Sequence, residues 1–259
     1  MKLSDNQKEI VKSSEKHIVV TAGAGSGKTT VLIEHALNIV KTKSTDSKIL
    51  VLTYSNKAAR ELEDRAKNSI DNYIDHLYVG TIHKFCTDII ARYGNTIDLD
   101  PSFQILESSD ERIELFKSAI DNYPELKHKI SHVKKPDKEI HSLFEKMGMV
   151  KRHKISIESL SVEHKQLFDE YNELLALQNS IDFDDILCYA YKILSEVKGV
   201  LKIYQRNFVS ICVDEAQDLN DIQYKIIKTL AGDRMSLFLV GDPSQAIYGF
   251  NGSSSKFMS

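Results

Sequence analysis

The sequence predicts an α/β protein with a parallel sheet and an inserted α-helical subdomain. Five short runs rich in β-branched residues are apolar throughout, as expected of parallel strands that are covered on both faces. Helical patterns separate these runs, and alternating strands and helices are typical of a parallel α/β sheet. The third and fourth runs lie about 125 residues apart, which is too long for a single crossover connection.

The expected elements can be placed in order along the chain. Strands are predicted at residues 17–21, 48–53, 77–81, 209–214 and 236–241. Helices are predicted over residues 27–40, from the cap Ser55 to about residue 68, and from starts near Ile82 and Asn220. In the long gap, a capping box at Ser108 and Glu111 precedes a helix that ends near Tyr123, and further helices are predicted at residues 162–178 and 182–197. The sheet domain is therefore expected in two parts, residues 1–90 and 206–259, with residues 91–205 as the inserted helical subdomain.

The composition is that of an ordinary soluble globular protein. Of 259 residues, 42% are apolar and 27% are charged, and the net charge is −3. An apolar run of about 18 residues, which a membrane span requires, does not occur, and the first residues lack the apolar stretch of a signal peptide. The three cysteines lie far apart without metal-ligand spacing, so we expect reduced thiols and a cytoplasmic location.

The charges are unevenly distributed along the predicted insertion. Residues 127–154 contain nine Lys/Arg and three Asp/Glu, whereas residues 155–185 contain eight Asp/Glu and only Lys165 as a basic residue. Two oppositely charged solvated faces would explain this pattern. A surface that contacts nucleic-acid phosphates would explain the basic segment equally well, so both interpretations stay open.

A glycine-rich stretch follows the first predicted strand and precedes a helix. Glycines let backbone N–H groups surround phosphate oxygens, and the helix N-terminus adds its positive dipole end. Lys28 would supply a cation to the β- and γ-phosphates, and the Thr29 hydroxyl would ligate Mg²⁺. Ala22 stands where the general phosphate-loop pattern has its first glycine, and a glycine-rich turn that binds nothing is the alternative. The predicted ATP-binding residues are Ala22, Gly23, Ala24, Gly25, Ser26, Gly27, Lys28, Thr29 and Thr30.

Two adjacent carboxylates follow the fourth predicted strand. Asp214 and Glu215 would lie at the carboxyl end of the sheet, where ligands bind in α/β proteins. Asp214 would hold Mg²⁺ and Glu215 would act as general base toward the attacking water. Taken alone, an Asp-Glu pair after a strand is often a polar turn. Together with the upstream loop, the pair predicts hydrolysis of a nucleoside triphosphate with ATP and Mg²⁺ as cofactors.

The motifs in their order resemble the UvrD/Rep-like superfamily 1 DNA helicases. The resemblance covers most of the chain and weakens in the inserted helices. It is carried by Asn6-Gln7, residues 22–29, residues 52–59, residues 80–83, Asp214-Glu215-Ala216-Gln217-Asp218 and residues 240–250. It implies a RecA-like P-loop NTPase fold, a Gln7 that reads the adenine edge, and a Gln245 that links the γ-phosphate to DNA-contacting aromatic residues.

The resemblance also implies a single-stranded DNA site. Aromatic rings at Tyr54, Tyr248 and Phe250 would stack on bases without sequence preference. Asn56, Thr81 and His83 would bond phosphate or sugar, although core packing of the aromatics and a structural role for His83 are the alternatives. The family usually has Trp-Arg where this chain has Phe250-Asn251, which removes a cation from the junction between DNA and phosphate.

In the family a second sheet domain closes over the nucleotide and supplies arginine fingers, and no segment of these 259 residues matches it. We therefore expect the ATP-binding lobe of a 3'→5' DNA helicase or translocase that needs a second lobe in cis or in trans. Alone, it would bind Mg-ATP and single-stranded DNA, hydrolyse ATP slowly and not unwind. A non-hydrolysing ATP-sensing subunit that regulates a partner is one alternative. A small-molecule P-loop kinase is another, but it leaves residues 81–83 and 245–250 without a role.

Overall fold

The computed structural model describes residues 3–42, 48–153 and 155–245. Contacts divide the chain into two compact units, residues 1–88 with 191–259 and residues 89–190. The predicted insertion had residues 91 and 205 as its bounds. Two helices run across the unit boundaries, α5 (Ile82–Tyr93) and α10 (Phe183–Glu196).

The first unit contains a five-stranded sheet in the order β1-β7-β6-β2-β3, in which every neighbouring pair is parallel. This confirms the predicted fold class. The strands are β1 (His17–Thr21), β2 (Lys48–Thr53), β3 (Leu77–Thr81), β6 (Phe208–Val213) and β7 (Ser236–Gly241). β6 begins and ends one residue before its predicted bounds, so Asp214 follows the strand directly.

Parallel pairing brings the carboxyl ends of the strands to one edge of the sheet. Thr21 pairs with Gly241, Thr53 with Thr81, and Leu52 with Val213. The segments that follow these strands include the phosphate loop, the acidic pair and the turn after β7. The sheet therefore gathers the predicted functional segments at the edge where α/β proteins bind ligands.

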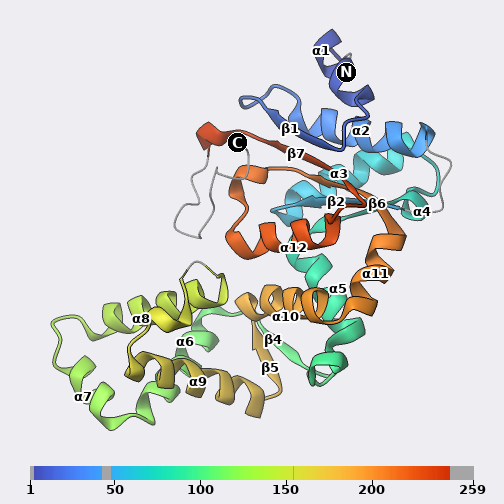
Figure 1. The fold of residues 1–259 in the computed structure, drawn as a ribbon. Coiled ribbons are helices and arrows are strands. Elements are labelled where there is room, and N and C mark those ends of the chain that lie inside the picture. The colour runs from blue at the N-terminus through green and yellow to red at the C-terminus, as the bar shows by residue number, and fades with distance from the viewer. Residues whose placement is uncertain (1–2, 43–47, 154, 246–259) are drawn as a thin grey trace. The chain divides into compact units, whose positions relative to one another are not determined.

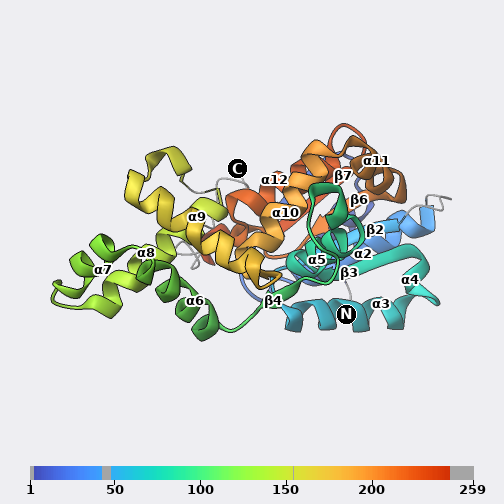
Figure 2. The same ribbon diagram turned by 90° about the horizontal axis from the view of Figure 1, so that it is seen from below.

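Alternate residues of the inner strands are buried on opposite faces of the sheet. Ile49 and Val51 join the apolar cluster under α2 (Lys28–Thr42) and α3 (Asn56–Ser69), while Leu50 and Leu52 are fully buried outside that cluster. Figure 1 shows α2 and α3 on one side of the sheet and α12 (Asp221–Ala231) on the other. In Figure 2, α3 runs beside β3. β1 differs from the prediction of burial on both faces, because it is an edge strand of the described sheet with alternating exposed and half-buried residues.

Polar side chains cap the helices of this unit where the sequence predicts starts. The Ser55 hydroxyl accepts from the backbone N–H of Ala58, and Asn220 forms a reciprocal capping box with Gln223. A helix that the sequence analysis missed, α1 (Asp5–Lys12), begins with a capping box between Ser4 and Gln7. The remaining elements of the unit are α4 (Tyr73–His76), α11 (Lys198–Asn207), and the short 3-10 helices η3 (Ala216–Asp218) and η4 (Pro243–Gln245).

The second unit is mainly helical, as predicted, but it also contains a small parallel sheet. Its helices are α6 (Ser109–Asp121), α7 (Pro124–Ser131), α8 (Pro136–Lys151) and α9 (Val162–Leu177), with 3-10 turns η1 (Gly94–Ile97) and η2 (Ile157–Ser159). The sheet pairs β4 (Gln104–Leu106) with β5 (Ser180–Asp182). Strands of three residues are too short to show a periodicity in the sequence, which explains why the prediction missed them.

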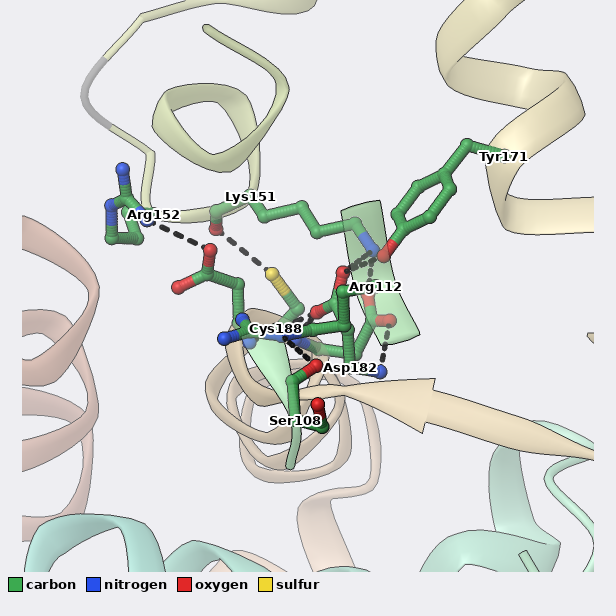
Figure 3. A network of polar contacts seen from close by, with 9 residues as sticks. Ser108, Arg112, Lys151, Arg152, Tyr171, Asp182 and Cys188 are labelled. Carbon is green, nitrogen blue, oxygen red and sulfur yellow. Dashed lines mark hydrogen bonds and ion pairs between the residues drawn. The ribbon is translucent and has the colours of Figure 1, made fainter. Parts of the chain in front are cut away.

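A buried charged cluster joins α8 to the start of α10 in this unit (Figure 3). The Lys151 ammonium lies 2.8 Å from Asp182 Oδ2 and 2.8 Å from Asp185 Oδ1, and its side chain is only 4% exposed. The Tyr171 hydroxyl donates to Asp182 Oδ2 at 3.2 Å, and the Cys188 thiol donates to the Lys151 carbonyl. Asp182 also accepts from the backbone N–H groups of Asp184 and Asp185. The charges are therefore paired and hydrogen-bonded, as buried charges must be.

Burial and neighbouring charges act in opposite directions on the pKa values of this cluster. Burial alone would lower the pKa of Lys151, but Asp185 and Asp182 outweigh it, so the pKa is raised and the ammonium stays charged. Burial tends to raise the pKa of Asp182, but the Lys151 charge outweighs it and the pKa is lowered. Burial, with repulsion from Asp182, raises the pKa of Asp185 to about 6. The cluster therefore holds one firmly ionised pair and one carboxylate that takes up a proton more readily.

Candidate functional site

The phosphate loop connects β1 to α2 with a backbone that only glycine adopts readily. Gly25 and Gly27 have φ values of 74° and 85°, in the left-handed region where a Cβ atom is unfavourable. The Ala22 N–H donates to the carbonyl of Gly241 at 3.2 Å, which ties the loop to the end of β7. The Lys28 ammonium donates to the carbonyls of Ala22 and Gly23 at 2.9 Å and 3.2 Å. The predicted strand–loop–helix arrangement is thus present, with Lys28 folded against the loop.

The loop and the acidic pair meet at one point. Thr29 Oγ1 donates to Asp214 Oδ2 at 2.9 Å, although the two residues are 185 positions apart. The Asp214 N–H donates to the Leu52 carbonyl, which fixes the chain as it leaves β6. Asp214 is 2% exposed, and burial raises its pKa even though the Thr29 hydrogen bond opposes the shift.

This pair of oxygen ligands fits Mg²⁺. A hydroxyl and a carboxylate within hydrogen-bonding distance are hard oxygen donors, and Mg²⁺ sites commonly combine one or two such groups with water and substrate phosphates. A buried carboxylate with a raised pKa is also one whose ionised form gains from a nearby cation. Among the described residues no group of three or more His, Cys, Asp or Glu side chains is arranged to hold a metal ion. The fit therefore depends on Thr29 and Asp214.

Glu215 is held by a neighbour to which the sequence analysis assigned no role. Its backbone is left-handed, with φ 52°, and its N–H donates to Asp214 Oδ1 at 3.0 Å. Gln217 Nε2 donates to Glu215 Oε2, while Gln217 Oε1 accepts from the Asp242 N–H, both at 2.9 Å. Gln217 lies within the quoted acidic motif, but nothing in its spacing shows that its side chain bridges two strand ends.

Asp218, at the end of the same motif, is also buried. One of its carboxylate oxygens, Oδ1, has no hydrogen-bond partner among the described residues. Burial, with repulsion from Glu215, raises the pKa of Asp218 to about 6. Asp214 and Asp218, which lie on either side of Glu215 in the sequence, therefore both have raised pKa values.

Two further side chains reach the phosphate loop from other helices. Gln7 Nε2 donates to the Ser26 carbonyl at 2.9 Å, while Gln7 Oε1 accepts from the Ser4 N–H. The predicted adenine-reading residue thus lies beside the loop, and its amide groups bond to the protein itself. Arg65 Nη1 on α3 donates to Thr30 Oγ1 at 2.8 Å. This contact joins the helix after the predicted DNA motif to the start of α2, and no pattern in the sequence indicates it.

The described DNA-motif residues follow β2 and β3. Tyr54 is half-buried, and Asn56 is exposed at the first position of α3. Thr81 is 7% exposed, and its hydroxyl accepts from the Lys84 N–H at the start of α5. Thr81 therefore has a structural role at the start of α5, and its contact with DNA stays a prediction. The side chain of Gln245, and the whole of Tyr248 and Phe250, lie outside what the structure describes.

His83 is half-buried on α5, and burial lowers its pKa to about 4. The imidazole is therefore neutral at pH 7 and can reach DNA only as a neutral hydrogen-bonding group. For a base whose pKa is lower in the folded than in the unfolded chain, the unfolded chain binds the extra proton. The contribution of the neutral His83 imidazole to the stability of the fold is therefore complete above pH 6.5, the ordinary pKa of histidine. It is lost as the pH falls toward 4.

Ion pairs neutralise part of the basic segment in residues 127–154. Lys127 pairs with Asp121 and Lys129 pairs with Glu163, while Lys151 and Arg152 pair with aspartates of the buried cluster. Lys151 and Arg152 therefore do not belong to a phosphate-facing surface. Three exposed lysines near the start of α8 have no ion pair among the described residues: Lys134, Lys135 and Lys138.

None of the helices in the described ranges combines the length and the apolar character needed to cross a membrane.

Sequence comparisons agree with the geometry. Residues 3–259 match the family model described as UvrD/REP helicase N-terminal domain. The chain is 30% identical over 255 residues to an ATP-dependent DNA helicase PcrA of Staphylococcus aureus, and 32% identical over 259 residues to the PcrA of Bacillus subtilis. A probable DNA helicase II homolog of Mycoplasma capricolum is 31% identical over 257 residues.

These alignments cover 96% of this chain and 34% or 35% of the relatives, so the chain spans about a third of their length. The family model covers nearly the whole sequence, and the resemblance inferred from the motifs is confirmed. The chain belongs to the UvrD/REP helicase N-terminal domain family.

Proposed function

We propose that this chain is the ATP-binding lobe of a 3'→5' DNA helicase or translocase, which binds Mg-ATP and single-stranded DNA. The observation that carries the proposal is the 2.9 Å contact between Thr29 Oγ1 and Asp214 Oδ2. It brings the phosphate loop and the acidic pair together, as a nucleotide-hydrolysing site requires. The named functions of the relatives, which are ATP-dependent DNA helicases, support the same proposal.

Each residue of the site has a distinct task in this proposal. Loop N–H groups from residues 22–30 surround the phosphates, and Lys28 exchanges its bonds with the loop carbonyls for bonds to the β- and γ-phosphates. Thr29 and Asp214 would hold Mg²⁺, which supplies positive charge beside the phosphates when bound. Glu215 accepts a proton from the attacking water, and Gln245 contacts the γ-phosphate. Gln7 turns its amide from Ser26 toward the adenine edge.

The test of the proposal is a measurement of Mg²⁺-dependent ATP affinity. Thr29→Val keeps the shape of the side chain and removes the hydroxyl, so ATP affinity with Mg²⁺ should fall at least about tenfold, equivalent to about 1.4 kcal/mol. Without Mg²⁺ the variant and the parent should bind alike. Thr42→Val is the matched control, because Thr42 lies at the other end of α2 and bonds only backbone carbonyls there. Equal losses with and without Mg²⁺, or no loss at all, would contradict the assigned role of Thr29.

The DNA part of the proposal places single-stranded DNA along Tyr54, Asn56, Thr81, His83, Tyr248 and Phe250. Two features of the described residues support it. Tyr54 and Asn56 follow β2, Thr81 ends β3, and both strands end at the edge of the sheet that carries the phosphate loop. Arg65, farther along α3 than the DNA motif, bonds to Thr30 beside that loop and so connects this helix to the nucleotide site.

The exposed lysines near the start of α8 would add electrostatic attraction for the DNA backbone. Replacing both Lys134 and Lys135 by Glu should weaken single-stranded DNA binding and reduce its salt slope by about one to two units, because each contact with a phosphate releases condensed counterions. Fluorescence anisotropy over a salt series measures the slope. The control variant, Lys198→Glu with Lys202→Glu, makes the same change in net charge on α11. Equal salt slopes in both variants would mean that Lys134 and Lys135 are solvated and do not contact DNA phosphates.

A second motor lobe, in cis or in trans, would complete the active site. Arginine fingers raise turnover by about 10³–10⁵ in related nucleotide hydrolases. We therefore expect slow hydrolysis from this lobe on its own and DNA-stimulated hydrolysis when a second lobe is supplied. The partner of this lobe would be single-stranded DNA, and its location would be the cytoplasm.

A further inference from the structure

The Gln217 side chain connects the proposed general base to the turn after β7. It is 2% exposed, and both ends of its amide are used. Nε2 donates to Glu215 Oε2 and Oε1 accepts from the Asp242 N–H, each at 2.9 Å. β6 and β7 are neighbouring strands, with Val213 paired to Leu239, so the amide spans the ends of two adjacent strands. One side chain therefore links the segments that follow both strands.

The chain of hydrogen bonds continues beyond Asp242 into η4. Asp242 is 5% exposed, and its Oδ1 accepts from the N–H of Ser244 at 3.0 Å and from the Ser244 hydroxyl at 2.5 Å. The next residue, Gln245, ends η4. A continuous series of hydrogen bonds thus runs from the Glu215 carboxylate through Gln217 and Asp242 to the backbone of the turn that carries Gln245.

Among side chains of this length, only a glutamine fits both partners. The Glu215 carboxylate needs a donor and the Asp242 N–H needs an acceptor, and a neutral amide offers both. Glutamate would place a second negative charge beside Glu215, and methionine would leave the buried Asp242 N–H without its acceptor. Glu215 also has a left-handed backbone, which is unfavourable for a residue with a Cβ atom, so its position depends on bonds of this kind.

We propose that Gln217 is a positioning residue, which fixes the Glu215 carboxylate for hydrolysis and ties that position to the turn after β7. A movement of η4 on binding nucleotide or DNA is passed to Glu215 through the amide. The inference rests on the proposed function, because it assumes that Glu215 acts on a bound nucleotide. It assigns to Gln217 the coupling between the DNA side and the catalytic side of the site.

The experiment compares Gln217→Met with Gln223→Met, both in the full chain with a second motor lobe supplied, because DNA-stimulated hydrolysis is expected only then. Gln223 is also a buried amide of this unit, 1% exposed, but its bonds belong to the α12 capping box. Single-turnover hydrolysis at saturating ATP should fall at least about tenfold in Gln217→Met, with the Kd for ATP within about threefold of the parent, and DNA should no longer stimulate it. Gln223→Met should keep both the rate and the stimulation. Equal rates in the two variants would overturn the inference.

Amide hydrogen exchange supplies a readout that does not depend on turnover. In the parent, Mg-ATP should change the exchange protection of the Asp242 and Ser244 amides together with that of the Glu215 amide. In Gln217→Met, the protection of Glu215 should change without a matching change at Asp242 and Ser244. The same nucleotide response in both proteins would contradict the coupling. No nucleotide response in the parent would instead contradict the proposed ATP site. If Gln217→Met does not fold, Gln217→Asn serves in its place, because the shorter amide cannot reach both partners.

Discussion

Replacing Lys151 by Met should lower the free energy of unfolding by about 3–5 kcal/mol. The variant removes the cation that lies 2.8 Å from both Asp182 and Asp185 and keeps the length of the side chain. Two carboxylates then stay buried without a counter-charge, and their desolvation is no longer offset. Chemical denaturation followed by circular dichroism at pH 7 measures the change.

Lys165→Met is the matched control for this prediction. Lys165 also forms an ion pair, with Glu158 at 2.6 Å, but the Glu158 side chain is 80% exposed. Exposed pairs contribute about 0–1 kcal/mol, so the control should stay within that range of the parent. The Lys151 charge lowers the pKa of Asp185, which is about 6 in the parent, so in Lys151→Met this pKa lies above 6 and the loss should already shrink as the pH falls from 7 toward 6. A loss below about 1 kcal/mol at pH 7 would show that water or rearrangement compensates the charges.

Replacing Glu215 by Gln should reduce the rate of ATP hydrolysis by about 10²–10⁴-fold, the usual contribution of a general base. The amide has the size of the carboxylate but cannot accept the proton of the attacking water. ATP affinity should change little, because the loop, Lys28 and Thr29 are untouched. Single-turnover hydrolysis with single-stranded DNA, with and without an added second lobe, separates the chemical step from binding.

The control for this prediction is Glu196→Gln, which removes an exposed carboxylate from the end of α10 in the same unit. It should hydrolyse ATP like the parent. If the Glu215→Gln variant is as active as the parent, Glu215 is not the general base. If the parent binds ATP but no second lobe produces turnover, the chain is instead an ATP-sensing subunit that regulates a partner.

Much of the fold was predictable because its determinants are local. Apolar runs between turns gave the bounds of β1, β2, β3 and β7, and hydroxyl or amide caps gave the starts of α3, α6 and α12. The meeting of Thr29 and Asp214 was predictable as well, since parallel strands bring their carboxyl ends to one edge. Only the pattern of the strands was needed for that inference.

The features that the sequence did not predict depend on how deeply a residue is buried and on side-chain contacts between distant segments. A sequence shows that Lys151 is basic, but not that two aspartates more than thirty positions later enclose it. The Arg65–Thr30 and Gln217–Asp242 contacts likewise depend on which rotamers the packed structure allows. The short strands β4 and β5 exist only because each supplies the other with a partner.

The close approach of Gln7 to the phosphate loop limits how far that loop can be treated as a transferable module. A Cβ atom at position 27 would lie 3.1 Å from Gln7 Nε2, and the φ of 85° already disfavours any side chain there. The Gln7 amide itself bonds to the backbones of Ser4 and Ser26. Grafting the loop into another scaffold, or varying it by directed evolution, would therefore require the amino-terminal helix to be carried along as part of the same building block.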